Sequence, residues 1–208
     1  MELIQRRNTP NKFFISTATS WNVEITKPAF EWLASGIDTF TNIIDMQGIA
    51  LDLYRNEIDG EYTGFACELM HHADINISNI QVEAKELTLE KLNQNPFGLF
   101  FQFPNIKNQY EYRITTGHSI TDKNGMKKEY PLQLGDESLG TQQLFMYAPI
   151  LKRAFDSGKV LVIDEIDKSL HPFIVKLLIN LFRDSKINTG GAQLIVTTHE
   201  TPLLSLET

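Results

Sequence analysis

Residues 159–165 read Lys-Val-Leu-Val-Ile-Asp-Glu, a short aliphatic run that stops at two carboxylates. Apolar residues without alternation are typical of a strand buried on both faces, as in the middle of a parallel sheet. We therefore expect Asp164 and Glu165 at the carboxyl end of such a strand. In open α/β sheets ligands bind at this edge. The alternative interpretation is a strand that simply ends in a polar turn, because turns favour Asp.

A second apolar strand is predicted at residues 193–199, which read Gln-Leu-Ile-Val-Thr-Thr-His and again end in an ionisable side chain. Between the two strands, residues 172–183 are almost wholly apolar and begin with Pro172, a pattern that predicts a largely buried crossover helix. Strand, helix and strand in this order predict a right-handed βαβ unit. If the two strands are neighbours, His199 lies beside Asp164 and Glu165.

Composition indicates a soluble globular protein of one large or two small domains: 208 residues, 42% hydrophobic and 22% charged. No apolar run approaches the roughly 18 residues needed to span a bilayer, and no signal-peptide core follows Met1. The single cysteine, Cys67, excludes a disulfide framework and favours a reducing, cytoplasmic location. The net charge of −7 does not indicate nucleic-acid binding by the chain as a whole. It is compatible with a local basic face or with DNA held by a partner.

The fold class expected is α/β, with a parallel βαβ core, an antiparallel hairpin and an N-terminal helical subdomain. Residues 1–84 are assigned to a mainly helical arm or insertion subdomain whose aromatic side chains lie in the core, and residues 85–208 to the α/β part. The hairpin is predicted at residues 110–119 and 127–134. Residues 85–95 read as a mobile helical insertion, and residues 97–103 as a buried strand or an interaction face.

A second informative stretch, residues 135–145, reads Gly-Asp-Glu-Ser-Leu-Gly-Thr-Gln-Gln-Leu-Phe and leads into a helix that is expected to bend at Pro149. Free backbone N–H groups and the helix dipole make such a helix start an anion site. The Ser138 hydroxyl adds one donor. The alternative is that Ser138 only caps the helix.

In order, residues 137–143, residues 160–165 and the Thr-Thr-His of residues 197–199 resemble the carboxyl-terminal half of an ABC-type ATPase, a P-loop NTPase. The likeness is greatest to AAA-family or ATP-binding proteins of bacterial defence and genome maintenance. These are similar to the overcoming-lysogenization-defect nucleases and to structural-maintenance-of-chromosomes heads. The specific likeness covers about residues 130–204, and the preceding region resembles only loosely the helical arm of such proteins.

The resemblance implies catalytic roles for three residues. Asp164 stands at the Walker B aspartate, which holds Mg²⁺ through water, and a carboxylate suits that hard cation. Glu165 stands at the catalytic glutamate, which orients and polarises the water that attacks the γ-phosphate of ATP. His199 stands at the switch histidine, whose imidazole donates a hydrogen bond to that phosphate.

The resemblance also implies a dimer. Ser138, Gly140 and Thr141 stand in the signature loop, which reaches the ATP held by the other subunit, and residues 168–171 stand in the loop that lines the seam. The usual signature is Leu-Ser-Gly-Gly-Gln, whereas here Leu139 replaces the first Gly and Thr141 replaces the Gln, as in the defence branch. ATP is thus expected between two heads that part after hydrolysis.

No GxxxxGK[ST] phosphate loop occurs in the chain, and the Gly158-Lys159 pair precedes a strand instead of following one. We therefore expect the chain alone to bind ATP poorly. Three explanations are open. The favoured one is a piece of a longer ATPase, because the sequence stops soon after His199; the others are half of a split ATPase, or a non-hydrolysing assembly or scaffold subunit.

The complete protein is expected to hydrolyse ATP and to drive or license an effector, such as a nuclease acting on nucleic acid, without a membrane partner. A rival reading is the AAA+ motor, since residues 163–167 also resemble its Walker B segment. That family places a sensor Asn where this chain has His199, and it lacks the upstream Ser-Leu-Gly-Thr loop.

Overall fold

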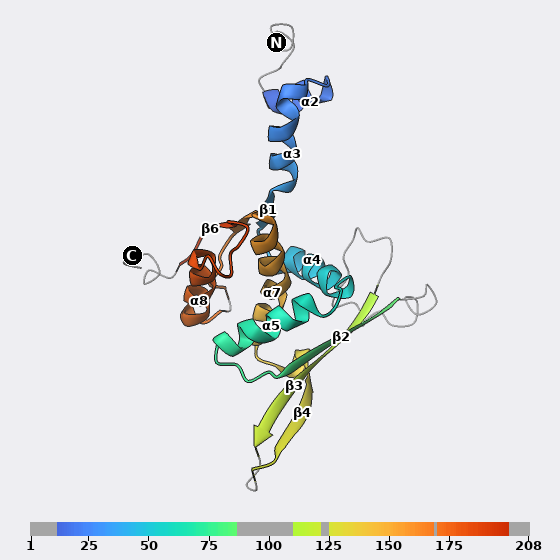
Figure 1. Cartoon of the computed structure of the whole chain (residues 1–208), viewed down its shortest axis with the longest axis vertical. Helices are drawn as coiled ribbons and strands as arrows, with labels where there is room; N and C mark the ends of the chain where they lie inside the picture. The colour runs from blue at the N-terminus through green and yellow to red at the C-terminus, as the bar shows by residue number, and fades with distance from the viewer. Residues whose placement is uncertain (1–11, 87–109, 122–124, 169, 200–208) are drawn as a thin grey trace.

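The computed structural model describes residues 12–86, 110–121, 125–168 and 170–199 (Figure 1). Residues 87–95 of the expected insertion, the run at residues 97–103 and Ser169 of the predicted seam loop lie outside these residues. The helical expectation is wrong for Lys85 and Glu86, which end strand β2 and pair with β3. The elements, in chain order, are α2 (Phe14–Ser20), η1 (Glu24–Thr26), α3 (Lys27–Ser35), β1 (Ile37–Phe40), α4 (Ile43–Arg55), α5 (Glu61–His72), β2 (Asn79–Glu86), β3 (Tyr110–Thr121), β4 (Lys127–Gln133), η2 (Leu134–Asp136), α7 (Leu139–Ser157), β5 (Val160–Ile163), α8 (Pro172–Arg183) and β6 (Gln193–Val196).

A parallel sheet of three strands has the order β1-β5-β6, so β5 is its central strand. Val160 pairs with Ile37 on one side and with Gln193 on the other. Leu161 is fully buried, as the unbroken apolar run predicts. The strands β5 and β6 and the intervening helix α8 confirm the predicted unit. Strand β1 is not predicted from the sequence, because four residues between two helices are too few to show a period.

A second sheet is antiparallel, with the order β2-β3-β4. It contains the predicted hairpin and adds β2 to it, in a register that places Ile80, Thr116 and Leu132 side by side on one face. Ile80 and Thr116 are buried there, where the sheet packs against the body. The far end of β3 and β4 extends beyond the body (Figure 1).

Helix α7 forms the centre of the body, packed against α4 and α5, and it continues through Pro149. Proline lacks the N–H that would bond the carbonyl group four residues earlier, which here belongs to Phe145. The Tyr54 hydroxyl from α4 donates to that carbonyl oxygen over 2.8 Å. The Tyr54 ring also stacks on Phe145 with 4.3 Å between centroids. Tyr54 thus replaces the hydrogen bond that Pro149 removes, and burial raises its pKa.

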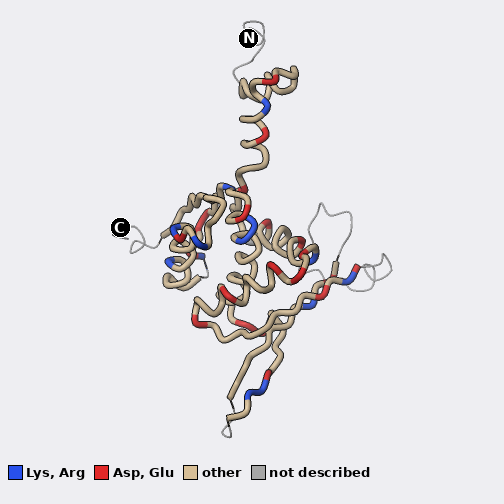
Figure 2. Tube along the Cα trace, viewed as in Figure 1, with Lys and Arg blue, Asp and Glu red and all other residues tan. Residues whose placement is uncertain are grey.

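Charged side chains of both signs are spread along the chain (Figure 2). At the amino end of β5, Lys159 does not sit in a phosphate-binding turn: its Nζ donates to Ser35 O over 2.7 Å and to Asp38 Oδ1 over 3.0 Å. Arg153 of α7 donates to the other oxygen of Asp38 over 2.6 Å. Gly158 ends α7 with φ of 66°. These ion pairs join β1, α7 and β5.

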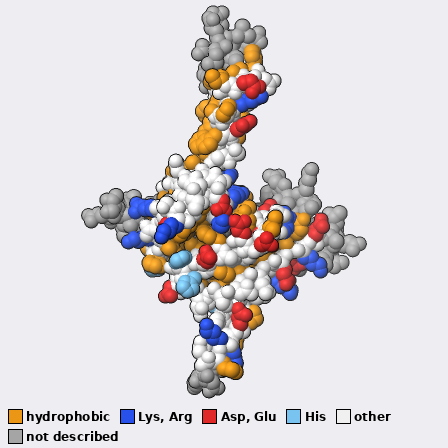
Figure 3. Space-filling model, viewed as in Figure 1, with side chains coloured by type: hydrophobic (Ala, Val, Ile, Leu, Met, Phe, Trp, Pro, Cys, Tyr) orange, Lys and Arg blue, Asp and Glu red, His pale blue; other side chains and the backbone are white. Residues whose placement is uncertain are grey.

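The helices α2 and α3 project from the body as an arm (Figure 1) that carries hydrophobic side chains on its surface (Figure 3). Phe13 is 83% exposed and Trp32 is 53% exposed. The expectation that the aromatic residues of this region lie in the core is therefore wrong for these two, because α3 has no buried residue and projects away from the body. Within the described residues, no helix combines the length and the apolar character that crossing a bilayer requires.

Candidate functional site

The carboxyl ends of β5 and β6 meet at one edge of the parallel sheet. Asp164 and Glu165 follow β5, and Thr197, Thr198 and His199 follow β6. Because the two strands pair in parallel from Val160 and Gln193 onward, their ends reach the same level. His199 Nε2 lies 3.4 Å from Glu165 Oε1. The structure thus brings the glutamate and the imidazole together beside Asp164, and we call this group of three residues the rim.

Thr197 binds both residues that follow β5, a contribution that the sequence pattern does not predict. Its Oγ1 donates to Asp164 Oδ1 and accepts from the backbone N–H of Glu165, the latter over 2.8 Å. Its carbonyl oxygen accepts from Ile166 N over 3.1 Å. A hydroxyl side chain directly after an apolar strand is the only sequence signal for this residue. Through it, β6 fixes the turn that carries both carboxylates.

Glu165 has a left-handed backbone with φ of 51°. A residue with a Cβ atom is rarely found there, and the strain costs on the order of 1 kcal/mol. The hydrogen bond from its N–H to Thr197 offsets part of this cost. Left-handed backbone at Glu165 redirects the chain abruptly after β5, and the carboxylate remains 46% exposed.

Asp167 ties the loop after β5 to the residue that follows β6. Its Oδ1 accepts from the backbone N–H of His199 over 3.1 Å. A side-chain hydrogen bond from Thr198 is the largest cause that lowers the pKa of Asp167, and the nearby His199 adds to the shift. Asp167 therefore orients the backbone that presents the imidazole. Lys168 Nζ lies 3.6 Å from Glu165 Oε2, but at 77% exposure this pair is weak.

The chemistry of the rim fits a nucleotide with its cation. The His199 side chain is 80% exposed, so a ligand can reach its ring nitrogens. No group of three or more His, Cys, Asp or Glu side chains within the described residues forms a metal cage. Mg²⁺ does not require one, because it usually binds one or two carboxylates and takes its other ligands from phosphates and water. Asp164 is the residue that would hold it.

Ser138 caps helix α7. Its Oγ accepts from Thr141 N over 3.1 Å and lies 2.8 Å from Thr141 Oγ1. Thr141 is buried, whereas the neighbouring Leu139 is 69% exposed. The capping interpretation of Ser138 is confirmed, and the anion-binding roles of Ser138, Gly140 and Thr141 stay predictions. Within the described residues, no hydrogen bond joins this turn to the rim.

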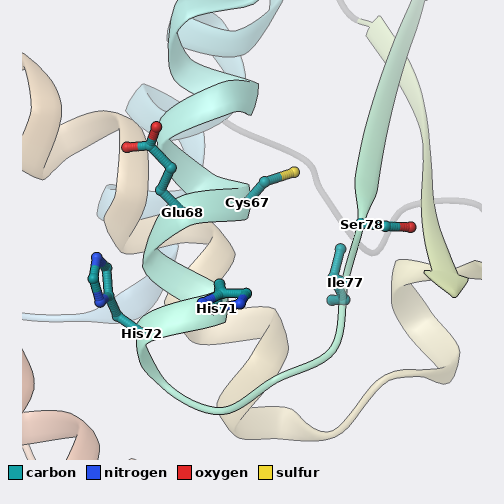
Figure 4. Close-up of a pocket in the computed structure, with 6 residues that line it drawn as sticks. All are labelled: Cys67, Glu68, His71, His72, Ile77 and Ser78. Carbon is teal, nitrogen blue, oxygen red and sulfur yellow. The ribbon is translucent and has the colours of Figure 1, made fainter.

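A shallow pocket of about 330 Å³ lies elsewhere, between α5 and β2 (Figure 4). Its lining comprises Cys67, Glu68, His71, His72, Ile77 and Ser78. Burial raises the pKa of the Cys67 thiol, which keeps it protonated and poorly nucleophilic. In Figure 4 the Glu68 side chain points away from Cys67. Among the described residues, the two histidines belong to no group of three side chains that could hold a metal ion. The pocket therefore adds nothing to the rim.

Comparison with known proteins identifies one family. Its sequence profile, described as "AAA domain, putative AbiEii toxin, Type IV TA system", matches residues 4–207. No curated protein matches the chain significantly. The profile covers nearly the whole sequence and includes the stretches that form the rim and the α7 start. The chain belongs to this AAA-domain family of nucleotide-binding P-loop ATPases.

Proposed function

We propose that this chain supplies the hydrolytic edge of an ABC-like ATPase site. The observation that carries the proposal is the rim, in which His199 lies 3.4 Å from Glu165 at the edge where Asp164 also ends its strand. Phosphoryl transfer to water needs a carboxylate that holds the cation, a carboxylate that orients the attacking water and a donor to the phosphate, here the imidazole. Their support by Thr197 and Asp167 favours a site whose geometry is held in advance.

Each residue has one task in this proposal. Glu165 accepts a hydrogen bond from a water molecule and aligns it with the γ-phosphorus, so that the new P–O bond forms as the bond to the β-phosphate oxygen breaks. His199 donates a hydrogen bond to a γ-phosphate oxygen. Asp164 is the residue that would hold Mg²⁺, which neutralises charge on the phosphates when bound. The left-handed backbone of Glu165 turns the chain after β5, and its carboxylate lies 3.4 Å from the imidazole.

The phosphate loop comes from a further segment, in the same protein or in a completing half. Strand β6 offers a place for it. Within the described residues, β6 pairs only with β5, and Ile195 on this edge strand is 56% exposed. An additional parallel strand at this edge would bury Ile195 and end beside the rim, where a loop after it could cradle phosphates.

The partner that we propose is a second head, with Ser138, Gly140 and Thr141 of one head facing the ATP of the other. The exposed side chain of Leu139 at the α7 start is compatible with such a seam. ATP would close the heads and hydrolysis would release them, which would license an effector such as a nuclease acting on nucleic acid. The family's description names a toxin of a type IV system, in keeping with an effector role in defence.

The proposal is tested on the assembly that copurifies with an affinity-tagged form of this chain, whose molar mass is measured by light scattering. With Mg-ATP, the variant Glu165→Gln should accumulate as a closed dimer of heads, because it binds ATP and does not hydrolyse it. Glu24→Gln, on the exposed arm, is the matched control and should behave as the wild type. A hexameric ring would support the AAA+ motor instead, and no binding of ATP would support a scaffold subunit; either result overturns the proposal.

A further inference from the structure

A largely buried, hydrogen-bonded cluster lies at the start of α7, apart from the rim. The Glu137 carboxylate is only 9% exposed. Its Oε1 atom lies 2.5 Å from Thr116 Oγ1 and 2.6 Å from His118 Nε2, both on β3. These contacts join residues about twenty positions apart in the sequence, and they connect the antiparallel sheet to the turn that carries Ser138.

Each contact has a defined direction. A carboxylate only accepts, so His118 Nε2 donates to it. Thr116 Oγ1 also lies 3.3 Å from Leu132 O, but its one proton goes to the closer, charged acceptor. Thr116 is fully buried. A buried carboxylate is costly without such donors, and two short hydrogen bonds therefore fix the position of Glu137 strongly.

The backbone of Glu137 is held as firmly as its side chain. Gln142 Nε2, one turn into α7, donates to Glu137 O over 2.8 Å. Ser138 is the next residue, and its Oγ caps the helix through Thr141 N. The Glu137 side chain is thus hydrogen-bonded to β3, while its carbonyl oxygen is hydrogen-bonded to a side chain of α7. A change in the angle between the sheet and the helix must change the direction of the intervening Ser138.

We propose that Glu137 is a positioning residue that sets the direction of the Ser138 hydroxyl, and that β3 acts on the signature turn through Thr116 and His118. The inference rests on the proposed function for the role of Ser138, but the coupling itself concerns this chain's own contacts. It assigns the antiparallel sheet a part in the ATPase cycle, since displacement of β3 reaches the α7 start directly.

Amide hydrogen exchange of the chain tests the coupling without nucleotide. Glu137→Ala removes both acceptor contacts and should speed exchange at the amides of Thr141 and Gln142 by roughly tenfold, the effect of losing about 1.4 kcal/mol. Glu137→Gln keeps an acceptor at the same place and should stay within about threefold of the wild type. The second half of α7 should be unchanged in both variants. Unaltered exchange in Glu137→Ala overturns the coupling.

The matched control is Glu129→Ala. Glu129 lies on β4 of the same sheet, and its carboxylate accepts from Ser78 over 2.9 Å, but it does not touch the α7 start. This variant should leave the Thr141 and Gln142 amides at wild-type exchange. Equal acceleration in the Glu129 and Glu137 variants would mean that loosening the sheet as a whole suffices, which contradicts a specific role of Glu137.

ATP turnover of the tagged assembly tests the consequence. Ser138→Ala and Glu137→Ala should each lower kcat, and the double variant should be no slower than Ser138→Ala, because Glu137 acts through Ser138. If the kcat losses of the two single variants multiply in the double variant, the inference is contradicted. Wild-type turnover in Ser138→Ala would refute the signature role in the proposed function, and the exchange experiment would then decide the coupling by itself.

Discussion

Replacing Tyr54 with Phe tests how α7 tolerates a proline in its middle. The substitution keeps the ring that stacks on Phe145 and removes only the hydroxyl group that donates to Phe145 O over 2.8 Å. Tyr54 is 2% exposed, so water does not readily replace the lost donor. An orphaned buried acceptor costs about 1–3 kcal/mol, and we expect the free energy of unfolding to fall by about 2 kcal/mol.

Pro149 supplies the decisive comparison. In the variant Pro149→Ala, the new N–H of residue 149 can bond Phe145 O as in an ordinary helix. The same Tyr54→Phe change should then cost only about 0.5–1 kcal/mol, which gives a coupling energy of roughly 1 kcal/mol in a double-mutant cycle.

Urea unfolding followed by circular dichroism measures all four proteins, with equal m-values as the check on comparable unfolded states. The single variant should also lose roughly 4–8 °C in Tm. Tyr130→Phe, at an exposed position in the middle of β4, is the control and should change stability little. The reasoning is refuted if Tyr54→Phe costs the same in both backgrounds, because the hydroxyl would then not be replacing the missing backbone donor.

Three further predictions concern the parallel sheet and its edge, all measured by urea unfolding. Thr197→Val removes the hydrogen bond to the Asp164 carboxylate and the acceptor of the Glu165 backbone N–H, and should cost about 1 kcal/mol or more. Thr39→Val, an exposed position on β1, should cost little. Folding lowers the pKa of Asp167 from about 3.8, so its carboxylate stabilises the fold above that pH, and this stabilisation is lost as the pH falls through the folded pKa. The difference in free energy of unfolding between the wild type and Asp167→Asn should therefore be full at neutral pH and vanish in acid. Leu161→Ala, in the fully buried centre of β5, should cost about 2–5 kcal/mol, against about 1 kcal/mol or less for Ile195→Ala on the exposed edge.

The sequence predicts the strands of the βαβ unit well because burial and period point to the same structure. The unbroken run before Asp164 is a central strand, and α8 spans Pro172–Arg183, the residues that the apolar pattern indicates. Strand β1 cannot be predicted, because its four residues are too few to show a period and become a strand only by pairing with β5. The exposed Trp32 shows the opposite error, because apolar character does not reveal which helices project from the body.

The supporting residues of the site could not be predicted from the sequence. The approach of His199 to Glu165 follows from strand order, which the pattern suggests. The roles of Thr197 and Asp167 depend on side-chain direction after each strand, and a period of two residues says nothing about that once the strand has ended. The Glu137 cluster depends on the register of β3 against β4, which only the three-dimensional pairing fixes.

Single-turnover hydrolysis of Mg-ATP by the tagged assembly tests the central claim most directly. If Glu165 aligns the attacking water, Glu165→Gln should slow phosphate release by at least about a hundredfold while ATP remains bound. Release at the wild-type rate would contradict the assignment of Glu165, and with it the reading of the rim as a hydrolytic edge.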